Sequence, residues 1–234
     1  MENKIAVFWF RRDLRLEDNA GLSKALQSGY KVMPLFIFDE HILNQLEDKY
    51  DRRVDYIHQA LTHIQKQLAD LNSNLLCLYG KPEDIFLKLF SEYNIAAIYC
   101  NRDYEPQAIK RDLNIKKLAE KYHISFYDFK DQVIFERNDI LKADGTPYTV
   151  YTPFANKWKA TLTPEDHTYH KLNKEAFQKL KSLPVRSLEE LGFQKTDIKF
   201  EVPALEAGII DTYDQYPDFP AMNHTTHLGI ALRF

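Results

Sequence analysis

The sequence predicts an α/β fold in which a five-stranded parallel sheet carries helices on both faces. Short, nearly continuous apolar runs occupy residues 5–10, 31–38, 75–79, 95–100 and 124–129. Such runs are expected of strands that are covered on both faces. Helical patterns separate the runs, and strands that alternate with helices form parallel sheets through right-handed crossovers. The predicted class is therefore a Rossmann-like α/β layer.

The helical segments carry their own start signals. Asp18 or Asn19 can cap the helix after the first strand, since short polar side chains accept hydrogen bonds from the first free N–H groups. Apolar residues recur at spacings of three and four over residues 54–71 and so lie on one helix face. Pro82 and Pro106 suit the first turns of the third and fourth helices, because proline has no N–H to leave unpaired there.

The alternation stops after residue 130, which divides the chain into three expected parts. Residues 1–130 form the α/β domain. Residues 131–200 are aromatic, rich in proline and aperiodic, as expected of a long interdomain linker. Residues 201–234 hold a short helical pattern and end on an apolar run, which is unusual for a solvated terminus. We expect them to be the truncated start of a helical domain.

Composition and motifs exclude several classes of protein. No apolar run is long enough to span a membrane and no secretory signal is visible, so we expect a cytoplasmic protein. The formal net charge of −3 gives no global field for nucleic acid, and residues 171–181 are the nearest approach to a basic patch. Their spacing also fits a solvated surface segment, which we favour. Cys77 and Cys100 lie in apolar runs without partners at metal-ligand spacing, so we expect buried thiols and no metal site.

Ligands of open parallel sheets bind beyond the carboxyl ends of the strands, where the strand order reverses. The residues just past each strand are therefore the first candidates, and most are charged: residues 11–12, 39–40, 80–81 and 101–105. Arg11 stands where a dinucleotide-binding fold has its glycine turn. Hydride chemistry on a nicotinamide is therefore disfavoured.

Two interpretations fit the charged segment of residues 11–18. An arginine near a buried strand end needs a carboxylate or an anionic ligand. The segment can form an internal ion-pair network, with candidate carboxylates at Asp13, Asp18, Asp39 and Asp103. It can also bind a planar anionic chromophore or nucleotide stacked on Trp9 and Phe38. Spacing alone leaves both open, and we expect a combination in which Arg11 faces the crevice.

Four separated segments then match one known family, in the family's order. They are FWFRRDLRLEDNAGL at residues 8–22, NRDYEPQAIKRD at 101–112, GTPYTVYTPFANKW at 145–158 and YDQYPDFPAMNHTTHL at 213–228. Together they resemble the cryptochrome and DNA photolyase family over essentially the whole chain. The resemblance implies an α/β domain that carries an antenna chromophore, a linker, and a helical domain that binds FAD.

The resemblance also implies a function. In such enzymes light-excited reduced flavin donates an electron to a cyclobutane pyrimidine dimer that is flipped out of UV-damaged DNA. In the family a helical half that completes the flavin pocket and binds DNA follows these segments, and we expect this chain to lack it. We therefore expect the fragment alone to hold no catalytic residue and to be inactive, and the whole protein to be a monomeric photolyase without metal or membrane contact.

The family's first FAD contacts match four residues near the end of the chain. Tyr213 corresponds to an early flavin-contacting tyrosine, while Thr225, Thr226 and Leu228 correspond to the segment along the diphosphate. Hydroxyl and backbone N–H groups suit that task. Gly229 replaces the last serine of the family pattern, which leaves one contact without its side chain.

The same comparison suggests antenna contacts in the α/β domain. Arg53 and Asp103 match positions that hold a deazaflavin or flavin in some relatives, and Arg11, Ile37 and Phe38 would line the same crevice. Where folate-binding relatives carry a glutamate, this sequence has Ala108. The resemblance thus favours a flavin or deazaflavin antenna over a folate, with an empty antenna site as the remaining alternative.

Two other functions stay open at this point. A cryptochrome, which is a blue-light receptor without repair activity, shares every matched segment. A free-standing nucleotide-binding α/β module would require the matches to be coincidental, and it predicts a domain that is complete near residue 130.

Overall fold

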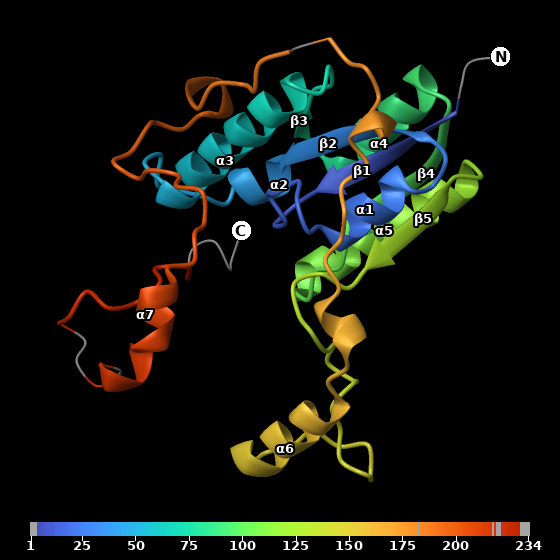
Figure 1. Cartoon of the computed structure of the whole chain (residues 1–234). Coiled ribbons are helices and arrows are strands. Elements are labelled where there is room, and N and C mark those ends of the chain that lie inside the picture. The colour runs from blue at the N-terminus through green and yellow to red at the C-terminus, as the bar shows by residue number, and fades with distance from the viewer. Residues whose placement is uncertain (1–3, 182, 217, 219–220, 230–234) are drawn as a thin grey trace.

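Five parallel strands form one sheet in the order β3-β2-β1-β4-β5 (Figure 1). The computed structural model describes residues 4–181, 183–216, 218 and 221–229. The strands are β1 (Ile5–Phe10), β2 (Lys31–Asp39), β3 (Leu76–Gly80), β4 (Ile95–Asn101) and β5 (Ser125–Phe129). Because each bound lies within one residue of the apolar run that predicted it, the predicted parallel sheet is confirmed.

The order of the strands places a switch point at the centre of the sheet. The chain runs from β1 outward to β2 and β3, then crosses back to β4 and β5 on the other side of β1. The strand order therefore reverses between β1 and β4. Their carboxyl ends flank the crevice where open α/β sheets bind ligands.

Helices cover both faces of the sheet. Helices α1 (Ala20–Leu26) and α3 (Arg52–Ala69) pack on one face, and α4 (Pro82–Glu92) and α5 (Pro106–Lys121) pack on the other. Asn19 caps α1, because its side chain accepts a hydrogen bond from Leu22 N, and Pro82 and Pro106 occupy first turns as predicted. A short helix that was not predicted, α2 (Glu40–Leu43), follows β2 with Asp39 as its cap.

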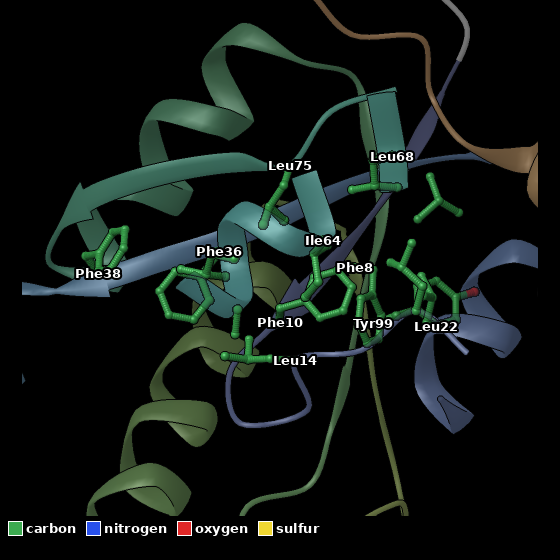
Figure 2. Close-up of a cluster of buried hydrophobic side chains, with 14 of the residues drawn as sticks. Phe8, Phe10, Leu14, Leu22, Phe36, Phe38, Ile64, Leu68, Leu75 and Tyr99 are labelled. Carbon is green, nitrogen blue, oxygen red and sulfur yellow. The ribbon is translucent and has the colours of Figure 1, made fainter. Parts of the chain in front are cut away.

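Two apolar cores result from the alternation of side chains along β1. Phe8 and Phe10 point toward α1 and α3 (Figure 2), whereas Val7 and Trp9 point toward α4 and α5. All six residues of β1 are buried. Burial on both faces explains why the strand reads as a continuous apolar run rather than an alternating one.

Residues 132–168, which we name the arm, project away from the sheet (Figure 1). The arm contains α6 (Tyr151–Thr161) and the 3-10 turn η1 (Pro164–His167). Helix α6 was not predicted, and none of its residues is buried. Its aromatic side chains contact other parts of the arm, as Trp158 does with Phe135 at 5.4 Å between ring centroids. A helix without a buried face has no periodic apolar signal, which is why the pattern looked irregular.

The described residues of 169–200, which we name the strap, run back along α1, β2 and α3. The N–H of Gln178 donates to Val32 O at 2.7 Å beside the start of β2. Farther along, the carboxylate of Asp55 on α3 accepts from Thr196 N at 2.6 Å and from Thr196 Oγ1 at 2.7 Å. The strap also holds the 3-10 turns η2 (Lys174–Ala176) and η3 (Glu189–Leu191). The strap therefore packs against the α/β body, and its role as an interdomain linker stays a prediction.

The described residues after 200 form α7 (Ala207–Asp211) and the 3-10 turn η4 (Tyr213–Gln215), and none of them is buried. That this part begins a helical domain stays a prediction, as do the two boundaries between the three expected parts. Within the described ranges, no helix combines the length and apolar character needed to cross a membrane.

Candidate functional site

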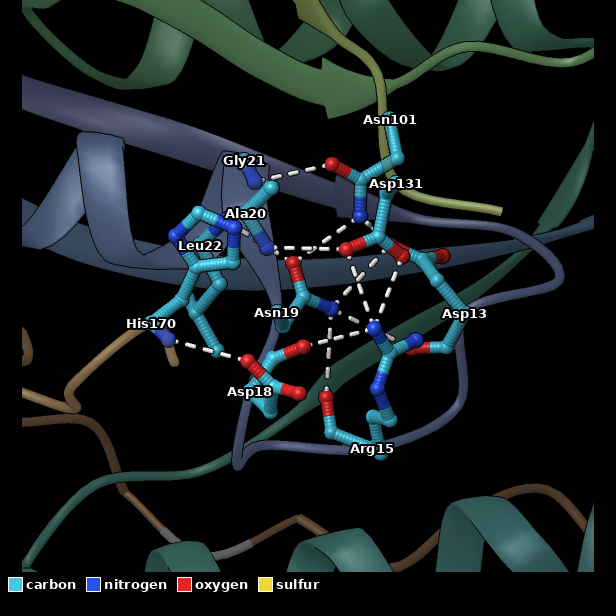
Figure 3. Close-up of polar contacts among 10 residues, drawn as sticks. All are labelled: Asp13, Arg15, Asp18, Asn19, Ala20, Gly21, Leu22, Asn101, Asp131 and His170. Atoms are coloured by element: carbon cyan, nitrogen blue, oxygen red, sulfur yellow. Dashed lines mark hydrogen bonds and ion pairs between the residues drawn. The ribbon is translucent and has the colours of Figure 1, made fainter. Parts of the chain in front are cut away.

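The switch point is filled by a buried polar cluster of Asp13, Asn19, Gly21 and Asn101 (Figure 3). Asn101 Nδ2 donates to Asp13 Oδ2 at 2.6 Å and to Asn19 Oδ1 at 2.9 Å. Asn101 Oδ1 accepts from Gly21 N at 2.8 Å. These side chains link the first loop, the start of α1 and the end of β4.

The cluster also explains the missing glycine fingerprint. Dinucleotide phosphates bind free N–H groups at this helix start in other doubly wound folds. Here Gly21 N donates to Asn101, Leu22 N donates to Asn19, and Ala20 N donates to Asp131 Oδ1 at 2.9 Å. The side chains of the protein itself thus bind the N–H groups that hold phosphate in those folds, which disfavours a free-standing nucleotide-binding module of that type.

Arg11 lies inside the protein rather than at an open crevice. Its side chain is 7% exposed and forms an ion pair with Asp112 on α5. The guanidinium carbon lies 5.1 Å from the ring centroid of Trp9, and that of Arg111 lies 4.9 Å from it. Two cations and the edge-on ring of Phe86 therefore surround Trp9. The internal ion-pair interpretation describes Arg11, and a direct pigment contact by Arg11 stays a prediction.

The carboxylate of this pair was not among those proposed from the sequence. None of the four suggested aspartates forms an ion pair with Arg11 in the described structure; Asp112 does. One available signal is the position of Asp112 four residues after Ala108 and three before Ile115, both buried on α5. A carboxylate on the apolar face of a helix needs a buried partner.

Asp103 does pair with an arginine of the charged segment, as the sequence suggested, but that arginine is Arg12 rather than Arg11. The Asp103 side chain is 7% exposed and lies 3.5 Å from Arg12 Nε. Arg12 Nη2 also contacts Glu105 at 2.7 Å, and Asp103 Oδ1 accepts from Glu105 N at 3.2 Å. Asp103 is thereby fixed just beyond β4, at the carboxyl edge of the sheet.

Arg53 lies in the first turn of α3, which begins shortly after β2 and α2. Its side chain is 64% exposed and pairs with Asp51, the cap of the same helix, at 2.5 Å between Nη2 and Oδ2. The hydrogen bond from Arg53 holds the pKa of Asp51 below its ordinary value, although burial acts in the opposite direction. Arg53 is therefore a solvent-facing cation at the same edge as Asp103.

Ile37 and Phe38 end β2 and point to opposite faces of the sheet. Ile37 packs in the core under α4 and α5, and Phe38 packs in the core under α1 and α3. Phe38 meets Phe36 edge to face at 5.0 Å between centroids. Both are buried side chains behind the edge where Arg53 lies exposed.

A third group at this edge involves Arg102 and Tyr104 from the predicted candidate range 101–105, but their partners Asp128 and Glu136 were not predicted. Arg102 pairs with Asp128 and contacts Glu136 at 2.8 Å, and the Tyr104 hydroxyl donates to the same Glu136 oxygen at 3.2 Å. Burial and the Glu136 carboxylate raise the pKa of Tyr104 to about 12. The cluster therefore anchors the start of the arm to the end of β4, with Tyr104 neutral at physiological pH.

The four expected FAD residues lie together in the last part of the described chain. Thr225 and Thr226 line a hollow of about 260 Å³ with Glu206, Ile209 and neighbouring residues. Tyr213 begins η4 and is largely exposed, while Leu228 is half-buried. Their contacts with FAD stay predictions.

A doubly wound parallel sheet with a polar switch point defines the class of α/β domains that bind ligands at the carboxyl edge. Within that class, a family model described as DNA photolyase matches residues 6–175. The chain belongs to the photolyase and cryptochrome family and corresponds to the N-terminal part of its members.

Individual relatives agree with this assignment. A deoxyribodipyrimidine photo-lyase of Synechococcus sp. (strain ATCC 27144 / PCC 6301 / SAUG 1402/1) is 33% identical over 97% of this chain and 50% of its own length. The crystal structure of a class III photolyase from Agrobacterium tumefaciens has a TM-score of 0.81 at 23% identity, over 99% of this chain and 51% of that one. An archaeal photolyase from Sulfolobus tokodaii, solved with two FAD molecules, has a TM-score of 0.69 at 25% identity, over 97% and 51%. The chain thus spans about half the length of these photolyases.

Proposed function

We propose that this chain is the α/β, pigment-binding half of a light-driven photolyase that splits cyclobutane pyrimidine dimers in UV-damaged DNA. The observation that carries the proposal is the family match over residues 6–175, together with a sheet whose carboxyl edge presents charged side chains. Reduced FAD supplies the electron in this chemistry. Because the chain spans about half of its photolyase relatives, repair and DNA binding are proposed for the whole protein, acting as a cytoplasmic monomer.

The antenna pigment is proposed to bind at the carboxyl edge and to be of the flavin or deazaflavin type. Arg53 is an exposed guanidinium whose donors suit a phosphate or a ring carbonyl. Asp103 is an acceptor already fixed by Arg12 and suits a ring N–H group. Ile37 and Phe38 end the strand β2 and are buried on opposite faces of the sheet, and Arg11 is buried against Trp9. We propose that these residues support the pigment site from within the sheet. The donor and acceptor set therefore fits a planar polar ring.

Residues near the end of the described chain are proposed to make the first contacts with FAD. Thr225 and Thr226 line one hollow and carry hydroxyls that suit a diphosphate. Tyr213 and Leu228 are proposed as further contacts from the family resemblance. The helical half that relatives carry is proposed to supply the rest of the pocket. The chain alone is therefore expected to hold FAD weakly and to repair no DNA.

Two measurements test this function. The purified chain is incubated separately with FAD, FMN, a deazaflavin and methenyltetrahydrofolate, and retained pigment is measured by absorption after gel filtration. Retention of a flavin-type pigment near one per chain supports the antenna proposal, and selective retention of the folate contradicts it. The whole protein is assayed for light-dependent splitting of a dimer-containing oligonucleotide. Bound FAD without repair would contradict the photolyase assignment in favour of a light receptor.

A further inference from the structure

The strap carries lysines that the proposed photochemistry does not use. Five exposed lysines lie on the strap, α1 and the start of β2, and we name them the lysine surface: Lys24, Lys31, Lys171, Lys174 and Lys179. No ion pair involves any of these five side chains in the described structure. Their charges are therefore not neutralised by a carboxylate among the described residues.

Contacts of the strap bring these lysines to one side of the molecule. Ser23 Oγ donates to Lys171 O at 2.9 Å, which places Lys171 beside α1, where Lys24 lies. Lys31 Nζ donates to Glu175 O at 2.6 Å, and Val32 forms a bridge with Phe177. Figure 1 shows this part of the strap, in orange, passing along α1. The five lysines thus form one surface rather than a run in the sequence.

The surface is predominantly basic and polar. Glu175 is the single acidic residue within residues 20–34 and 171–181, which contain six lysines in all. Among the described residues of these two ranges, Tyr30 is the single large hydrophobic side chain that is exposed. Insertion into a membrane or docking of an amphipathic peptide would need apolar side chains. A phosphate backbone needs only cations.

We propose that the lysine surface binds the sugar-phosphate backbone of a nucleic acid, without regard to sequence or damage. The surface borders the start of β2, so it lies toward the amino edge of the sheet, opposite the edge proposed for the pigment. It would give the α/β half its own contact with DNA, separate from dimer recognition. The net charge of −3 makes this a local rather than a global attraction.

The test measures binding of the purified chain to an undamaged, fluorescently labelled DNA duplex. Fluorescence anisotropy of the duplex reports binding between 25 and 200 mM salt, in the dark and without flavin. Weak binding is expected, with a dissociation constant of about 10⁻⁴ to 10⁻⁶ M that rises steeply with salt. The triple variant Lys171→Glu/Lys174→Glu/Lys179→Glu should weaken binding about tenfold or more and reduce the salt slope by about 3.

The matched control reverses three exposed lysines of α5 instead, in the variant Lys110→Glu/Lys117→Glu/Lys121→Glu. It changes the net charge equally, and circular dichroism and thermal unfolding verify that both variants fold. Equal weakening by both triples would overturn the proposal in favour of net charge alone. The absence of detectable DNA binding at 25 mM salt would also overturn the proposal. Binding to phosphatidylserine vesicles instead of DNA, lost in the strap triple variant, would overturn it as well. Because neither light nor FAD is involved, the result is independent of the repair assay.

Discussion

The backbone N–H of Gly21 donates a hydrogen bond to Asn101 Oδ1 at 2.8 Å, and this contact leaves no room for a side chain at residue 21. A Cβ atom there would lie 2.5 Å from Asn101 Oδ1 and 3.1 Å from both Cys100 O and the Phe8 ring. Glycine is needed here for close approach rather than for an unusual backbone angle. The start of α1 therefore rests directly on the end of β4.

Gly21→Ala should lower the free energy of unfolding by about 1–3 kcal/mol, because the added methyl forces apart groups that are fixed by packing. Urea unfolding of the purified chain measures the change. Gly208→Ala is the matched control, since nothing lies within 4 Å of a Cβ there and alanine favours the helix α7. A neutral Gly21→Ala variant would contradict the geometry of the switch point.

Asp112→Asn should destabilise the chain by about 3–5 kcal/mol, because it leaves the buried guanidinium of Arg11 without its carboxylate. Glu92→Gln removes an exposed pair with Lys88 and should change stability by about 0–1 kcal/mol. Since Asp112→Asn can prevent folding altogether, the double variant Arg11→Met/Asp112→Leu provides a second measurement. The double variant should recover much of the lost free energy of unfolding, because it removes both buried charges. A double variant that is no more stable than Asp112→Asn would contradict a purely structural role for the Arg11–Asp112 pair.

Asp55→Asn should loosen the strap, because Thr196 loses a charged acceptor for its N–H and hydroxyl groups. We expect a loss of about 1–3 kcal/mol in unfolding free energy and faster hydrogen exchange near residue 196. Asp70→Asn, at an exposed position after α3, is the control.

The same carboxylate predicts a pH dependence. Burial raises the pKa of Asp55, but hydrogen bonds from Gln59 and Thr196 outweigh burial and hold the pKa below the ordinary 3.8. The stabilisation is therefore complete above about pH 4 and is lost as the pH falls through the lowered pKa. Unfolding measured between pH 2.5 and 6 should show this loss in the natural chain and less of it in Asp55→Asn. Identical pH profiles would contradict the role of Asp55.

Arg53→Ala should reduce retention of a flavin-type antenna about tenfold without a large change in stability, because the side chain is mostly exposed. The neighbouring Arg52, which is 62% exposed and pairs with Asp197, provides the control Arg52→Ala. Independently of any pigment, Arg53→Ala should raise the pKa of Asp51, whose strongest stabilising contact is the hydrogen bond from Arg53. Carboxyl chemical shifts measured by NMR report that change even if the pigment proposal fails.

The sheet could be predicted from the sequence because its information is local. Each buried strand is a continuous apolar run, and each main helix starts at a polar cap or a proline. Arg11 and Asp112 are 101 positions apart in the sequence. Local residue spacing does not predict a contact over such a separation. Helix α6 buries none of its residues, so it produces no apolar period to detect.

The candidate site could be predicted only in part from the local sequence pattern. The rule that ligands bind beyond the carboxyl ends of strands located the correct edge for Arg12 and Asp103. It did not show that Asp13, Asn19 and Asn101 fill the switch point themselves. Arg53 and the FAD residues came from the family resemblance alone, since neither charge nor periodicity distinguishes them from other surface positions.

The arm leaves the α/β body and rejoins it at nearly the same place. Asp131, just before it, accepts from Ala20 N at 2.9 Å, and His170, just after it, donates from its backbone to Asp18 Oδ1 at 2.9 Å (Figure 3). Both ends are thus held by residues 18 and 20 at the start of α1. Because both ends of the arm are held at the start of α1, a change in the length of the excursion between them need not move the strands of the sheet, and chains tolerate such changes most readily in exposed segments.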